Sequence, residues 1–322
     1  MAQSGTMPMG HLVDMIGVAR EADLERVEPV RVGVMVDAQC DRALVLAVRD
    51  ALLPVHEGAT LSISLISDGA EATRASTWDL GIVIAGGSDA QVVRAVRTLA
   101  GQGVPVAVVA ESALDAPDAG LSEAQAHLVA VVAASDAREV VRGLARWLVT
   151  ATPKGTALAA NFPFCRKARV DELVRSYAAK NAAAGAMSKS EGESSSLSSS
   201  QARLYMQIAA AYGRAPSLGR ALELSGVLWA GYGYGVITRS ALGIIPGTGW
   251  ALRASVGYLG TWMTAKAVAT YFDRQDAGEA VIPTPKVVEA AGNAVRAAWA
   301  NRRRRAGAAL SDALVPLRGA TS

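Results

Sequence analysis

The sequence is poor in the residues on which catalysis and cross-linking depend. Its 322 residues include two cysteines, Cys40 and Cys165, and three histidines, His11, His56 and His127. Two widely separated cysteines without a Cys-x-x-Cys spacing are too few for a disulfide framework or a zinc site, and they suit a reducing cytosol. The histidines are scattered along the chain, so we assign none of them as a metal ligand or a catalytic base.

Several functional motifs are also missing. Neither His-Glu-x-x-His nor Gly-x-Ser-x-Gly occurs, so there is no sign of a zinc protease or a serine hydrolase. A net charge of +3 is too small to indicate nucleic-acid binding. Residues 1–17 lack the basic region, apolar run and cleavage site of a signal peptide. We therefore expect no enzymatic activity, no cofactor, no metal and no nucleic-acid partner.

Apolar runs alternate with helical patterns through the first 150 residues. Hydrophobic residues make up 51% of the chain and aromatic residues 5%, so a large core of small aliphatic side chains is available. Strands are expected at 31–36, 60–66, 80–85, 104–110 and 127–133. Continuous apolar strands alternating with helices are typical of a parallel sheet covered on both faces. We predict a three-layer α/β domain over residues 1–150.

Helices are expected between these strands. One covers 41–53, and two others begin at capping boxes, Ser88 with Gln91 and Asp136 with Glu139. A short amphipathic pattern at 10–20 predicts a further helix, packed on the α/β domain.

The loops after the strands are where α/β domains bind ligands. A phosphate-binding P-loop needs glycines, a lysine and a Ser or Thr. After the first strand the chain reads Asp-Ala-Gln-Cys-Asp-Arg-Ala-Leu. Whether Asp37 or Gly33 is aligned with the first glycine of the P-loop motif, no lysine falls at the required position. The carboxylate of Asp37 would also repel phosphate. The segment 110–115 lacks the asparagine and lysine with which small GTPases read guanine, although 133–135 resembles their Ser-Ala loop. The domain thus resembles a degenerate GTPase without the P-loop.

Other interpretations of these loops stay open. Asp37 and Asp41 could hold magnesium, but Asp41 is better explained as a helix N-cap. Gly86 and Gly87 could accept an anion before a helix, but a tight turn needs the same residues. A nucleotide hydrolase with a divergent site at the strand ends is the main alternative for this half.

The second half has a helical composition. Residues 151–156 form a short linker, and 157–186 are helical except at Pro163. Residues 187–200 are rich in serine and predict a flexible linker, followed by a helix over 201–214. We predict a Gly/Ala-rich, all-α helical domain over 157–276.

The stretch 221–272 is nearly all apolar or small and contains many glycines. Such small-residue faces are typical of tight helix pairs in apolar surroundings. Arg239, Pro246 and Arg253 divide the stretch into pieces shorter than the roughly 20 residues that a spanning helix needs. A helical core and contact with a membrane surface both stay open, and a spanning bundle ranks third.

Several segments of this half carry a family resemblance. They are 203–213 (RLYMQIAAAYG), the glycines of 226–235, Arg239, 245–250 (IPGTGW) and 257–261 (GYLGT). In combination they resemble the GTPase-associated bacterial family called domain of unknown function 697, over about 157–272. The resemblance implies association with GTPase-like domains and often with membranes, and it implies no catalytic residues. The chain departs from the family at the serine tract, where relatives carry an apolar segment.

Residues 284–322 form a basic C-terminal helix and tail. Thr284 and Pro285 begin a helix that runs from Lys286 past Trp299. Beside Trp299 lies a basic cluster, Arg302, Arg303, Arg304 and Arg305, which can bind anionic lipid headgroups. A solvated charged face is the alternative.

These features lead to the hypothesis of a non-enzymatic scaffold or assembly protein, cytoplasmic and peripheral to the inner face of the cell membrane. An anionic membrane surface and a protein partner or self-association are the expected contacts. The expected contact residues are Trp229, Arg239, Trp250, Trp262, Trp299, Arg302, Arg303, Arg304 and Arg305. The alternatives are a divergent GTP-binding protein and a soluble adaptor that binds its partner through the helical domain.

Overall fold

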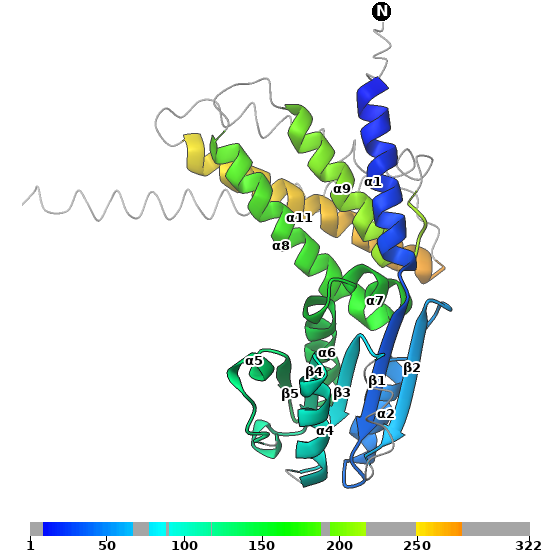
Figure 1. Ribbon diagram of the computed structural model, residues 1–322. Coiled ribbons are helices and arrows are strands. Elements are labelled where there is room, and N and C mark those ends of the chain that lie inside the picture. Colours follow the sequence, from blue (N-terminus) through cyan, green and yellow to red (C-terminus); the bar gives the residue numbers. More distant parts are fainter. Residues whose placement is uncertain are drawn as a thin grey trace, which may run out of the picture.

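A five-stranded parallel sheet forms the first part of the molecule. The computed structural model describes residues 9–66, 77–87, 90–116, 118–187, 194–216 and 249–278. The strands are β1 (Val30–Val36), β2 (Ala59–Leu65), β3 (Leu80–Ile84), β4 (Val106–Ala110) and β5 (Val129–Ala133), in the order β2-β1-β3-β4-β5 (Figure 1). The predicted α/β class and all five predicted strands are confirmed, with ends that differ by at most two residues.

The strand side chains alternate between two buried faces. On one face, Val30, Val32, Val34 and Val36 of β1 join a core with α2 (Arg42–Ala51) and α6 (Ala137–Ala151). On the other, Met35 and the β4 residues Val106 and Val108 pack with α4 (Ala90–Gly101). Gly33 belongs to this second face, where a Cβ atom would lie 2.0 Å from the ring of Trp78. Burial on both sides explains why the central strands β1, β3 and β4 read as almost continuous apolar runs.

The helix starts follow the predictions in part. Asp41 caps α2, because its carboxylate accepts the N–H of Leu44 at 3.2 Å. Asp136 caps α6 by accepting the N–H of Arg138 at 2.8 Å. The predicted capping box at Asp136 is nevertheless wrong, because the Glu139 side chain pairs with Arg142 instead. A complete box opens α5 (Glu123–Ala126) at Ser122, and Ser88 lies outside the described residues.

The chain passes from the sheet to the helices through a buried helix, α7 (Gly155–Asn161). All seven of its residues are buried, although the sequence suggested a linker up to 156. A turn at Pro163–Cys165 follows, as the predicted break at Pro163 requires, and α8 (Arg166–Met187) begins directly after it. Leu158, Phe162 and Cys165 belong to the same core cluster as β1. The core therefore continues from the sheet into the helical part without interruption.

Three long helices pack together beyond α7. Leu204 and Ile208 of α9 (Ser194–Ala211), with Tyr212 just after it, form a cluster with Val268 and Phe272 of α11 (Gly249–Asp276). Leu173 and Val174 of α8 complete this cluster. The prediction of a flexible serine tract is wrong for residues 194–200, which form the start of α9. Adding residues to an existing helix needs no new nucleus, so this helix extends into a polar segment. Residues 188–193 lie outside the described part.

The N-terminal helix, α1 (Met9–Val27), belongs to the helical part. Val18, Ala19 and Ala22 pack against Met206 and Ala210 of α9. The prediction that this helix packs on the α/β domain is therefore wrong. Small side chains on both helices let the backbones approach closely, which the local pattern of α1 could not reveal.

The helical part, with α1, α7, α8, α9 and α11, lies at the edge of the sheet where the strands begin (Figure 1). Lys154, just before α7, donates from Nζ to the carbonyl of Pro29 at 2.9 Å and to Asp79 Oδ1 at 2.8 Å. The other oxygen of Asp79 accepts the N–H of Arg31 at 2.8 Å. Since β1 has seven residues and a strand rises about 3.3 Å per residue, the carboxyl edge of the sheet lies roughly 20 Å away.

Candidate functional site

The loops after β1 and β3 meet at the carboxyl edge of the sheet. Asp37 directly follows β1 and is only 8% exposed. Its carboxylate accepts the N–H of Gly86 at 3.0 Å, beyond the end of β3, and the N–H of Gln39 at 3.2 Å. The chain leaves β1 toward β2 on one side, whereas β3 lies on the other. Asp37 therefore lies between β1 and β3, where the order of the strands in the sheet reverses direction. Open α/β sheets bind their ligands at such a point.

The two loops touch along their backbones. A Cβ atom on Gly86 would lie 2.5 Å from the carbonyl carbon of Gln39 and 2.6 Å from the nitrogen of Cys40. The Cys40 thiol donates to the carbonyl of Ile84 at 2.9 Å. Burial, and then the nearby charge of Asp37, raise the pKa of this thiol to about 11. Gly86 is thus required by the close approach of the two loops.

The amide groups at this edge are paired with carboxylates of the chain itself. Asp37 accepts from Gly86 and Gln39, and Asp41 accepts from Leu44 in the first turn of α2. Phosphate-binding loops present such N–H groups to the ligand instead. The exposed side chain of Glu111, directly after β4, belongs to the same edge. The site consequently presents negative charge where a nucleotide would bring phosphates.

The loops in which GTPases read guanine have local structural roles here. Ser112 follows β4 closely and caps the short turn Ala113–Asp115 by accepting the N–H of Leu114 at 3.1 Å. Asp136, after β5, caps α6. As for the magnesium alternative, no cluster of three or more His, Cys, Asp or Glu residues that could hold a metal exists within the described ranges.

The predicted membrane or partner contacts lie mostly outside the described residues. Those outside are Trp229, Arg239, Trp299, Arg302, Arg303, Arg304 and Arg305. Trp250 lies in the first turn of α11. Trp262, farther along α11, is 46% exposed, and Lys266 is exposed one helical turn later. In the part of the chain that the structure describes, no helix has both the length and the hydropathy to cross a bilayer.

A polar network between helices was not foreseen from the sequence. Thr156 of α7 is buried, donates to Glu25 of α1 at 3.0 Å and accepts from Arg169 of α8 at 2.8 Å. Arg169 also pairs with Glu172. The Thr156 and Glu25 positions are 131 residues apart, so no local spacing indicates this contact.

No family model, no curated protein and no solved structure matches this chain. The resemblance to the family called domain of unknown function 697 stays a prediction. Of its motifs, 203–213 spans the C-terminal part of α9 and the turn after it, and 257–261 lies within α11; these two helices pack against each other. The motifs at 226–235, Arg239 and most of 245–250 lie outside the described residues.

Proposed function

We propose that the chain is a non-enzymatic, membrane-peripheral scaffold or assembly protein. Its α/β part would be a GTPase-like domain that works without nucleotide, and its helical part a relative of domain of unknown function 697. The observation that carries this proposal is the position of the Asp37 carboxylate on the amide groups of Gly86 and Gln39. An incoming phosphate would have to displace this carboxylate and would be repelled by its charge.

The position of the helices supports a role without a nucleotide switch. GTPase switches act through loops that contact the γ-phosphate and change order when it is lost. In this chain the helical part is attached at the amino edge of the sheet, through Lys154 and α7. In the described part of the chain, the loops of the carboxyl edge lie at the other end of the strands from this attachment.

The membrane part of the proposal is supported by α11. The half-exposed ring of Trp262 suits the membrane interface, where tryptophan is enriched. The exposed cation of Lys266, one turn away, can gain about 1 kcal/mol near an anionic surface. Trp299 and the cluster Arg302–Arg305 would add to the same contact.

Calorimetric titration of the full chain with GTP and magnesium tests the nucleotide-free domain. We expect no heat of binding at physiological nucleotide concentrations, and the same result with ATP. Micromolar affinity for either nucleotide would overturn the proposal and favour the divergent nucleotide hydrolase.

Flotation with phosphatidylserine liposomes tests the membrane contact. The full chain should float at low salt, and changing Arg302, Arg303, Arg304 and Arg305 to glutamine should weaken binding and flatten its salt dependence, because charge interactions are screened over about 8 Å at physiological ionic strength. The matched control changes four exposed arginines of the α/β part, Arg42, Arg138, Arg142 and Arg146, to glutamine. A full chain that stays in the soluble fraction even at low salt would leave the soluble adaptor as the better function.

A further inference from the structure

The strand β2 leaves one edge of the sheet open. It is the last strand on its side, with β1 as its neighbour. The N–H of Val30 donates to the carbonyl of Gly58 at 3.0 Å, just before β2 begins. The N–H of Ile66, just after β2, donates to the carbonyl of Val36 at 2.8 Å. Backbone groups alternate in direction along a strand, so the even-numbered residues of β2 face β1.

The odd-numbered residues of β2 direct their backbone groups away from the sheet. These residues are Ala59, Leu61, Ile63 and Leu65. Within the described part of the chain, none of their outward N–H and carbonyl groups has a hydrogen-bond partner. A row of such groups is a template on which another strand can pair.

This edge lacks the usual protection against pairing. Proteins protect edge strands with charged side chains, proline, a bulge or a short length. The strand β2 has seven residues and contains neither a charged residue nor a proline. It pairs with β1 in one continuous register without a bulge. The side chains of Ile63 and Leu65 are 48% and 63% exposed, so apolar surface lies beside the open backbone groups.

The opposite edge of the sheet is better protected. The strand β5 has five residues, and it contacts both α5 and the turn at Ala113–Asp115. A short strand with loops packed beside it is less accessible to another chain. The strand β2 is therefore the more suitable edge for a partner.

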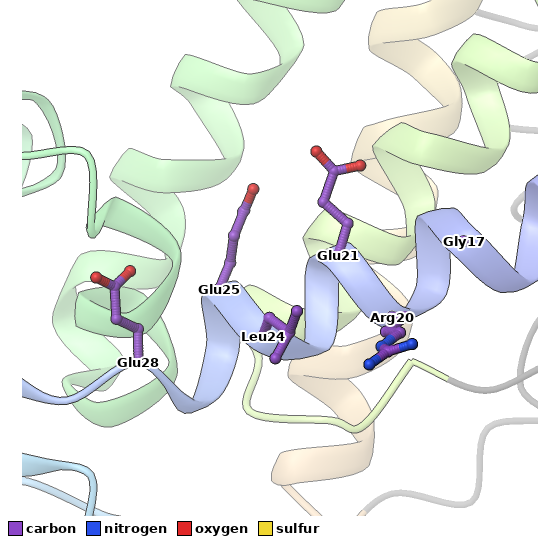
Figure 2. A pocket seen from close by; sticks show the side chains of 6 residues that line it. All are labelled: Gly17, Arg20, Glu21, Leu24, Glu25 and Glu28. Atoms are coloured by element: carbon purple, nitrogen blue, oxygen red, sulfur yellow. The ribbon is translucent and has the colours of Figure 1, made fainter.

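The open pocket of about 560 Å³ along α1 offers a different kind of surface (Figure 2). Three glutamates line it, and each already has a partner in the chain. Glu21 pairs with Arg203 at 3.3 Å, and Glu28 lies 3.7 Å from Lys154. Glu25 accepts a hydrogen bond from Thr156. These charges are used within the fold, in contrast to the backbone groups of β2.

The sequence of β2 is complementary to itself. Two antiparallel copies can be related by a twofold axis that passes through Ser62. Leu61 then lies opposite Ile63 of the second copy, and Ala59 lies opposite Leu65 of the second copy. These are the residues with outward backbone groups, so each opposed pair exchanges two hydrogen bonds. All the side chains that meet on this face are apolar.

The other face of the paired strands matches equally well. Thr60 lies opposite Ser64 of the second copy, and Ser62 lies opposite itself across the axis. Hydroxyl groups thus meet hydroxyl groups, and such cross-strand pairs stabilise a sheet. Since β2 carries no charge, the pairing opposes no like charges. This match between a strand and its own copy indicates which partner the edge fits.

We infer that two copies of this chain pair through β2, antiparallel, so that one sheet continues through both. The same patch on each copy forms the contact, as in most homodimers. The pairing supplies partners for the outward backbone groups and covers Ile63 and Leu65. It goes beyond the proposed function, because neither the Asp37 loop nor α11 takes part. Nucleotide titration and liposome flotation can therefore fail without affecting this pairing, and the reverse also holds.

Sedimentation equilibrium of the full chain tests the pairing. The full chain should sediment with twice the chain mass of 33.2 kDa. Ile63→Pro removes an N–H that points away from β1, and an edge strand accepts proline at such a position. Ile63→Lys keeps this N–H and places a cation opposite Leu61 of the second copy. Each variant should raise the dissociation constant of the dimer about tenfold or more, because the change occurs twice in the dimer.

The matched control is Val131→Lys on β5. Val131 is 51% exposed, close to the value for Ile63, and this variant should remain a dimer. Circular dichroism verifies that each variant is folded, and the two Ile63 variants fail independently of each other. A monomeric full chain, or a dimer that persists in the folded Ile63 variants, would overturn the pairing. Equal dissociation by Val131→Lys would overturn it too and indicate that β2 of one copy pairs with β5 of the next.

A single cysteine tests the register. At the twofold axis the two Ser62 residues form a pair without backbone hydrogen bonds, with Cα atoms about 4.5 Å apart. This separation lies within the range of about 4.4–6.8 Å that a disulfide needs. Ser62→Cys should therefore give a covalent dimer of the full chain under mild oxidation.

The control for the register is Thr60→Cys, on the same face of the same strand. Both positions are exposed in the single chain. In the paired strands the two copies of residue 60 lie about 13 Å apart, four positions along the strand, so this variant should stay monomeric under denaturing, non-reducing conditions. The unchanged chain gives the background from Cys40 and Cys165. Equal cross-linking of the two variants, or none in Ser62→Cys, would refute the antiparallel pairing at Ser62.

Discussion

Asp37 and Gly86 lie 49 residues apart in the chain and are joined by a hydrogen bond of 3.0 Å across the carboxyl edge of the sheet. The bond links the loops after β1 and β3 and holds their backbones in contact. An acidic side chain that would repel a phosphate therefore has a structural role at the same position.

Replacing Asp37 by alanine should destabilise the protein clearly. The change leaves the N–H groups of Gly86 and Gln39 without their acceptor, and hydrogen bonds to charged groups contribute about 1.5–3 kcal/mol each, so we expect a loss of about 2–3 kcal/mol. Urea unfolding measures this loss. The control is Asp118→Ala. It removes an exposed hydrogen bond from the N–H of Gly120, two residues along the chain, and should cost under about 1 kcal/mol. Equal losses in the two variants would contradict the role of Asp37.

Lys154→Met should loosen the attachment of the helices to the sheet. The change removes the bonds of Nζ to Pro29 and Asp79 at a largely buried position, and we expect a loss of about 1.5–3 kcal/mol in the free energy of unfolding. Lys167→Met is the control, because Lys167 makes an exposed pair with Asp171 on α8 and should change stability by under about 0.5 kcal/mol. A similar effect of both changes in urea unfolding would show that Lys154 does not hold the junction.

Two glycine-to-alanine changes should have opposite signs. A Cβ atom on Gly155 would lie 2.6 Å from the carbonyl oxygen of Val149, so Gly155→Ala should destabilise by about 1–3 kcal/mol through overpacking. Gly17 of α1 has nothing within 4 Å of its Cβ position, so Gly17→Ala should stabilise by up to about 1 kcal/mol. Thermal unfolding of both variants measures the two shifts. A stable Gly155→Ala protein would mean that α7 can move away from α6.

The Cys40 thiol should react slowly at neutral pH and faster in base. Only the thiolate is nucleophilic, and its pKa is raised from 9.0 to about 11, so alkylation by iodoacetamide should rise with pH toward an inflection near 11. Because the folded pKa is the higher one, the stability that Cys40 contributes is present below pH 9 and is lost as the pH rises through 11. Burial also raises the pKa of Cys165, which should react only after unfolding. An inflection near 9 in the Cys40 rate, measured with Cys165→Ala, would contradict this environment.

The centre of the sheet could be predicted from the sequence because its strands β1, β3 and β4 are buried on both faces. Each of β3 and β4 is buried at all five positions, so both read as uninterrupted apolar runs. The N-cap at Asp41 was also predictable, since capping depends on residues within one turn.

The contacts between distant segments could not be predicted in the same way. Asp37 stood out at a strand end, but its bond to Gly86 depends on how two loops approach each other in space. The burial of α7 and the bond between Thr156 and Glu25 depend on packing between elements far apart in the chain. The small residues of α1 fit the surface of α9, which lies much later in the sequence. The residue pattern within α1 does not indicate which helix it packs against.

The packing of α1 on α9 has a consequence for synthesis on the ribosome. Glu21 and its partner Arg203 are 182 residues apart, and translation proceeds at about 5–20 residues per second, so roughly 10–40 s pass before that partner is made. Throughout this interval the nascent chain leaves Val18, Ala19 and Ala22 without the surface that buries them in the finished protein. The surface that buries α1 is therefore made long after α1 itself, and the apolar side chains of this helix stay exposed on the nascent chain in the meantime.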